Sequence, residues 1–146
     1  MMSQDHLNAT NGKIIIYDLG AGRSKLILQT FLEFPNVTKI VGVELSTTRF
    51  EMGKTALLEY CSLQNKESEK QRSSCLTYKA TSGDGKIEIV ETNSETKQLR
   101  SLEARIQNLF ETANEIDSAD IVVCETVCST FPPRSLQNSH FSPTVW

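Results

Sequence analysis

The sequence is poor in the residues that build metal and disulfide sites. Its two histidines, His6 and His140, each stand in a polar stretch near one end of the chain, where neither makes a convincing ligand or catalytic base. The cysteines form no C-x-x-C pair, which favours free or buried thiols over zinc and disulfides. These cysteines are Cys61, Cys75, Cys124 and Cys128.

Long apolar runs and a strong charge of one sign are also lacking. The first twelve residues contain no apolar stretch, so we expect neither a secretory signal nor a membrane span. A net charge of -3 gives no overall attraction to nucleic acid. We therefore expect an intracellular protein, cytoplasmic or nuclear, and its 146 residues are enough for about one domain.

What is present is an alternation of buried-strand and amphipathic-helix patterns. Runs rich in isoleucine and valine predict strands over residues 13–19, 39–45, 86–91 and 120–124. Apolar residues spaced three or four apart predict helices over residues 23–34, 46–63 and 96–114. Residues 64–86 are mostly polar and are interpreted as a solvated insertion or loop.

This alternation predicts the fold class and its boundaries. Strands that alternate with helices indicate an α/β protein with a Rossmann-like, doubly wound parallel sheet, truncated here after the fourth strand. We expect a polar leader over residues 1–12, one domain over 13–128, and an irregular Ser- and Pro-rich tail over 129–146. In such a sheet a ligand binds beyond the carboxyl ends of the strands.

A glycine turn joins the first predicted strand to the first predicted helix. Gly20 and Gly22 allow a sharp turn and a close approach to a ligand, although such a turn can serve geometry alone. Asp18 stands just before the turn, and Glu44 closes the second strand, where a carboxylate can accept hydrogen bonds from both hydroxyls of a ribose. Together these residues predict a crevice that binds a nucleoside.

The charge of Asp18 indicates which nucleoside fits. A dinucleotide would place its pyrophosphate over the turn, where Asp18 opposes it, and Lys25 stands where the dinucleotide pattern has its third glycine. An NAD-linked oxidoreductase is therefore the weaker hypothesis, and the phosphate-binding P-loop pattern is absent from the sequence. S-adenosyl-L-methionine instead brings an ammonium and a sulfonium, which a carboxylate attracts.

The sequence resembles a known family at these positions. Residues 16–22 (Ile-Tyr-Asp-Leu-Gly-Ala-Gly) resemble motif I of class I S-adenosylmethionine-dependent methyltransferases, and residues 41–45 (Val-Gly-Val-Glu-Leu) resemble their second motif. With Leu28-Gln29 and residues 118–123 (Ser-Ala-Asp-Ile-Val-Val), they are similar to non-SET histone lysine methyltransferases of the disruptor-of-telomeric-silencing type. The resemblance covers residues 13–128 and implies a histone-like protein lysine as methyl acceptor.

The resemblance also implies the cofactor contacts. Asp18 would meet the methionine ammonium, the turn would pass under the methionine, Glu44 would bind the ribose, and Leu45 would pack on the adenine. The end of the 86–91 strand, Glu91 to Asn93, would approach the adenine edge. The implied cofactor-binding residues are Asp18, Gly20, Ala21, Gly22, Glu44, Leu45, Glu91 and Asn93.

Several positions depart from the family pattern. Ser24 stands at the third motif glycine, and Cys124-Glu125-Thr126 replaces the asparagine pair, or the Asn-Pro-Pro-aromatic motif, that follows the fourth strand. Glu125 is the candidate catalytic acceptor for a substrate amine, although a Glu at a strand end is often only exposed. The later helix and strands of the family are missing.

These departures leave a second hypothesis open. The chain would then be a truncated or degenerate cofactor-fold domain without catalysis, acting as a binding or interaction module. An open edge at the fourth strand would favour a partner or self-association.

Overall fold

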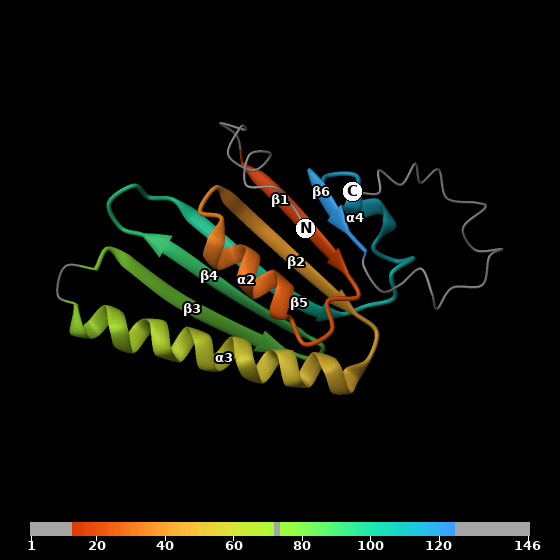
Figure 1. The fold of residues 1–146 in the computed structure, drawn as a ribbon, viewed down its shortest axis with the longest axis horizontal. Coiled ribbons are helices and arrows are strands. Elements are labelled where there is room, and N and C mark those ends of the chain that lie inside the picture. Colours follow the sequence, from red (N-terminus) through yellow and green to blue (C-terminus); the bar gives the residue numbers. More distant parts are fainter. Residues whose placement is uncertain (1–12, 72–73, 125–146) are drawn as a thin grey trace.

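The computed structural model describes residues 13–71 and 74–124, which form a mixed α/β arrangement around one sheet (Figure 1). Its strands are β1 (Ile14–Leu19), β2 (Val37–Glu44), β3 (Leu76–Gly83), β4 (Lys86–Asn93), β5 (Leu99–Ile106) and β6 (Ile121–Val123). Its helices are α2 (Lys25–Glu33), α3 (Thr47–Lys70) and the single turn α4 (Ala113–Ile116). The predicted leader over 1–12 and tail over 129–146 lie outside the described residues.

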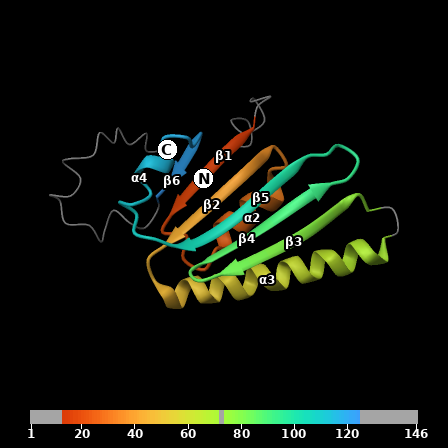
Figure 2. The same ribbon diagram turned by 180° about the vertical axis from the view of Figure 1, so that it is seen from behind.

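The sheet combines a parallel part with an antiparallel hairpin. The strand order is β3-β4-β5-β2-β1-β6. Strands β5, β2, β1 and β6 run parallel, so their carboxyl ends share one edge, which we call the carboxyl edge. The hairpin β3–β4 adds two antiparallel strands beside β5, so the prediction of an all-parallel sheet is wrong in this part (Figure 2).

Alternating side chains divide the core between the two faces of the sheet. Ile16 and Ile40 pack with residues of α2 and α3, which cover one face (Figure 1). Their neighbours Tyr17 and Val41 point to the other face and pack with Ile116 of α4. This alternation is the period of two that every strand imposes on its side chains.

The predicted helix over residues 96–114 is wrong, because the strand β5 occupies residues 99–106 of it. Residues 99–106 contain leucine, glutamate, alanine and arginine, all strong helix formers, and their spacing of apolar residues also suits a helix. Pairing with β2 on one side and β4 on the other overrides this local preference. Glu103 is buried on the strand and ion-paired with Lys86 and Arg105, so charge does not mark exposure here.

The interpretation of residues 64–86 as a solvated loop is also wrong. Helix α3 continues to Lys70, and β3 follows as an edge strand with half-buried Leu76, Tyr78 and Ala80. The Asn65 side chain fastens the two elements, since its Nδ2 donates to Tyr78 O (2.9 Å) and its Oδ1 accepts from Tyr78 N (3.2 Å). A half-exposed edge strand carries many polar residues, which explains why this segment resembled a loop.

Candidate functional site

The turn after β1 is built from residues in left-handed backbone conformations. Gly20 has φ +91°, Gly22 has φ +58°, and Ser24, the residue before α2, has φ +62°. The N–H groups of Gly20 and Ala21 both donate to the carbonyl of Val43, at 2.8 and 3.0 Å. The turn is therefore fastened to the end of β2.

Two glycines outside the turn allow the turn to pack closely against β2 and α3. A Cβ at Gly42 of β2 would lie 2.8 Å from the Ala21 Cβ. A Cβ at Gly53 of α3 would lie 2.5 Å from the Ser24 Oγ and 3.0 Å from the backbone carbon of Arg23. The separations of 2.8 and 2.5 Å are too short for non-bonded atoms, so the packing of the turn requires glycine at both positions.

Glu44 has the most defined geometry at the carboxyl edge. The residue is 6 % exposed. Its Oε2 accepts from the Gly22 N–H and its Oε1 from the Ser46 N–H, each at 2.8 Å. These bonds orient the carboxylate between the turn and the start of α3. A carboxylate has about four acceptor positions, so two further donors can bind without displacing either amide.

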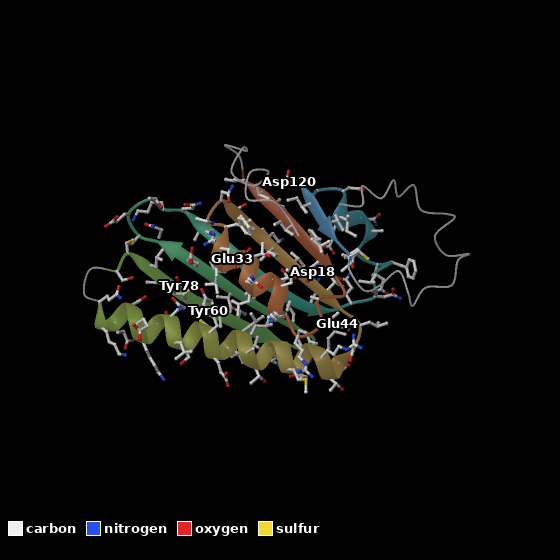
Figure 3. The ribbon with its side chains drawn as sticks, viewed as in Figure 1. Asp18, Glu33, Glu44, Tyr60, Tyr78 and Asp120 are labelled. Atoms are coloured by element: carbon white, nitrogen blue, oxygen red, sulfur yellow. The ribbon has the colours of Figure 1, made fainter. Side chains whose placement is uncertain are left out.

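Asp18 lies beside this carboxylate on the adjacent strand. It is 5 % exposed and stands at the end of β1, in register with Gly42 of β2 and Val123 of β6. Because strand side chains alternate, Asp18 and Glu44 project from the same face of the sheet. Both lie toward the carboxyl edge (Figure 3). The structure therefore brings together two buried carboxylates and the glycine turn.

Leu45 adds an apolar surface to the same place. It follows Glu44 directly, and 68 % of the residue is exposed to solvent. A leucine beside a buried, oriented carboxylate offers a platform on which a flat ring can pack. The turn residues, both carboxylates and Leu45 are thus grouped as the sequence predicted.

Glu91 and Asn93 are not part of this group. Strand β4 runs antiparallel to β5, so its end pairs with the start of β5, and Glu91 lies opposite Arg100. Both residues are at the amino ends of the parallel strands, away from the turn. The prediction placed the 86–91 strand in a parallel sheet, whereas β4 is antiparallel and β5 is the parallel neighbour of β2.

The end of β5 supplies the residue that the sequence analysis missed. The Gln107 N–H donates to the Glu44 backbone carbonyl at 3.2 Å, which places the Gln107 backbone beside the end of β2. Leu102, Ala104 and Ile106 recur at every second position, which is the spacing typical of a strand. This pattern could have predicted that a strand ends directly before Gln107.

Several candidate residues lie outside the described part of the chain. Glu125, the candidate catalytic residue, lies outside the described residues, as do His6, His140 and Cys128. The remaining cysteines, Cys61, Cys75 and Cys124, form no disulfide with one another, and burial raises the pKa of Cys61. Within residues 13–71 and 74–124, no cluster of three His, Cys, Asp or Glu side chains could hold a metal ion.

Comparisons of the chain with protein-family models, curated proteins and solved structures find no match. In the described part of the chain, no helix has both the length and the apolar character needed to cross a membrane.

Proposed function

We propose that this chain binds S-adenosyl-L-methionine at the carboxyl edge, within a Rossmann-like methyltransferase fold. The parallel strands β5, β2, β1 and β6 support the proposal, because β1 is followed by β2 on one side and paired with β6, which comes last, on the other. Such a reversal of strand order creates a crevice beyond the carboxyl ends of the strands. The glycine turn follows β1, at this position.

The oriented Glu44 carboxylate is the observation that carries the proposal. Amides of Gly22 and Ser46 hold it in place, so it can accept hydrogen bonds from two ribose hydroxyls without first reorganising. Asp18 lies on the neighbouring strand, toward the turn. A cofactor that crosses this edge would have its ribose over β2 and its methionine over β1.

Charge favours this cofactor over a dinucleotide. Asp18 and Glu44 are two buried carboxylates on the same face of the sheet, and a pyrophosphate placed between them and the turn would be repelled. The ammonium and sulfonium of S-adenosylmethionine would be attracted instead. In this proposal the adenine packs on Leu45, with Gln107 near its edge in place of Glu91 and Asn93.

The proposed reaction is methyl transfer to a lysine amine of a histone-like protein, in the cytoplasm or nucleus, as the motif resemblance implies. The sulfonium is already an activated donor, so the protein has mainly to align it with the nucleophile. Glu125 is the proposed acceptor for the substrate amine.

The open strand β6 supports a second candidate, an interaction module without catalysis. Among the described residues, β6 pairs on one side only, with β1. Its three residues, Ile-Val-Val, carry no charge, whereas edge strands that avoid association usually do. Such an edge could pair with a partner or with a second copy.

Calorimetric titration separates these functions. We expect S-adenosylmethionine and S-adenosylhomocysteine to bind and NAD not to bind. Glu44→Gln replaces one carboxylate oxygen by an amide NH2 group and removes the negative charge, so the side chain can no longer accept a charge-assisted hydrogen bond from each ribose hydroxyl. The substitution should weaken binding by about tenfold or more, because hydrogen bonds to a charged group contribute about 1.5–3 kcal/mol. Glu88→Gln is the matched control, since Glu88 lies on β4 and projects from the opposite face. Binding of NAD alone, or of none of the three, would refute the proposal.

A further inference from the structure

A pocket lies near the amino ends of the parallel strands, away from the carboxyl edge. It has a volume of about 370 Å³ and lies where α2, α3 and the strands β3, β4 and β5 meet. This size suits a group as large as one or two rings. Glu91 and Asn93 line this pocket rather than the carboxyl edge.

The deep part of the pocket is aromatic. Tyr60 of α3 and Tyr78 of β3 lie edge to face, with their ring centroids 6.0 Å apart and their planes at 80° (Figure 3). Phe31 of α2 is fully buried, and the Arg100 guanidinium lies 4.1 Å from its ring centroid. Burial raises the pKa of both tyrosines, so their hydroxyls stay uncharged at neutral pH.

The charged groups of the pocket compensate one another. Arg100 and Glu91 form an ion pair at 3.0 Å, and Glu91 is 8 % exposed. The other nitrogens of Arg100 donate to the carbonyls of Val37, Phe31 and Phe34. Each of the three guanidinium nitrogens therefore already has an acceptor near the end of α2. A charged ligand would lose its hydration here without gaining a free counter-ion.

Hydrogen-bonding groups remain at the rim. The amide side chains of Gln64 and Gln98 line the pocket, and neither has a hydrogen-bond partner among the described residues. Each amide offers both donors and an acceptor. Leu32, which is 55 % exposed, adds an apolar surface beside them.

We infer that this pocket binds an uncharged heteroaromatic ring that carries hydrogen-bond donors and acceptors on its edge. Tyr60 and Tyr78 supply the surface for the ring, the rim amides bind its polar edge, and the Glu91–Arg100 pair, which has no net charge, disfavours a charged ligand. This inference does not depend on the proposed methyltransferase function, because the two sites lie at opposite edges of the sheet.

Three ligands of nearly equal shape test the inference: nicotinamide (neutral), nicotinate (anionic) and 1-methylnicotinamide (cationic). Each is titrated into the ¹⁵N-labelled full chain, and the shifts of backbone and side-chain amide signals are recorded. We expect nicotinamide to shift the side-chain amides of Gln64 and Gln98, and to bind more tightly than either charged analogue. Equal binding of all three, shifts that map elsewhere, or no shifts would each overturn the inference.

A rim variant adds a test that leaves the core intact. Gln98→Ala removes one amide and should weaken nicotinamide binding about fivefold, the equivalent of one neutral hydrogen bond of about 1 kcal/mol. Gln29→Ala is the control, because Gln29 is an exposed amide on α2 that bonds Glu33 and does not line the pocket. An unchanged affinity in Gln98→Ala would also contradict the inference.

Discussion

Ser24, the residue before α2, has two features that are unfavourable for the folded state. It adopts φ +62°, a conformation that suits glycine, and its hydroxyl is buried without a hydrogen-bond partner among the described residues. Both features cost free energy, about 1 kcal/mol or more each. The chain tolerates them because the turn is fastened to Val43 and packed under Gly53.

We therefore expect Ser24→Gly to stabilise the protein. Relief of the backbone strain and of the unpaired hydroxyl should outweigh the greater freedom of glycine in the unfolded chain, for a net gain of about 1 kcal/mol. Urea denaturation measures the free energy of unfolding. Gly53→Ala is the contrasting variant, because its Cβ would meet Ser24 Oγ at 2.5 Å, and it should lower that free energy by about 2 kcal/mol. A loss of stability in Ser24→Gly would show that the hydroxyl has a favourable role.

At the scale of elements, α4 is attached to the sheet by an ion pair. The Arg105 guanidinium of β5 lies 2.7 Å from Glu115 Oε2, and the Tyr17 hydroxyl donates to the same oxygen at 3.4 Å. The hydrogen bond from Arg105 holds the pKa of Glu115 below its ordinary value. These bonds help to position the segment that follows Gln107.

The lowered pKa of Glu115 predicts a pH dependence. A carboxylate whose pKa is lower in the folded state stabilises that state above its unfolded pKa, and the contribution is lost as pH falls through the folded pKa. Since Glu115 is 44 % exposed, the effect should be about 0.5 kcal/mol. Glu115→Gln should be less stable than the natural chain at pH 7 and equally stable in acid. Urea denaturation at several pH values checks this, and a difference that persists in acid would contradict it.

At the scale of the whole molecule, the antiparallel hairpin and the carboxyl-edge site belong to different parts of the sheet. Strand β3 lies at one end of the strand order, and β1 lies four positions away. The edge strand contacts mainly β4 and α3. Loss of β3 would therefore affect the stability of the sheet more than the geometry of the turn.

A strand replacement tests this separation. We expect polar Gly-Ser residues in place of residues 76–83 to lower the free energy of unfolding by several kcal/mol, because the aromatic contact of Tyr78 and a row of strand hydrogen bonds are lost. Under conditions where the variant remains folded, the affinity for S-adenosylhomocysteine should change less than twofold. Calorimetry with circular dichroism measures both quantities. A large loss of affinity in a folded variant would show that the hairpin closes the site.

The sequence by itself determined the local unit formed by β1, the glycine turn, α2 and β2. Each of these elements has a clear hydrophobic period, and the turn needs left-handed residues at Gly20 and Gly22, so neighbouring residues are sufficient to predict them. Asp18 and Glu44 were placed correctly because each ends a strand whose direction follows from this unit.

Only the tertiary structure decided the rest of the sheet. Residues 99–106 suit a helix locally, and become a strand because β2 and β4 pair with them from both sides. The direction of β4 then places Glu91 beside Arg100 instead of near the turn. Hydrogen bonds between strands join residues far apart in the chain, and no short-range pattern specifies which segments will pair or in which direction.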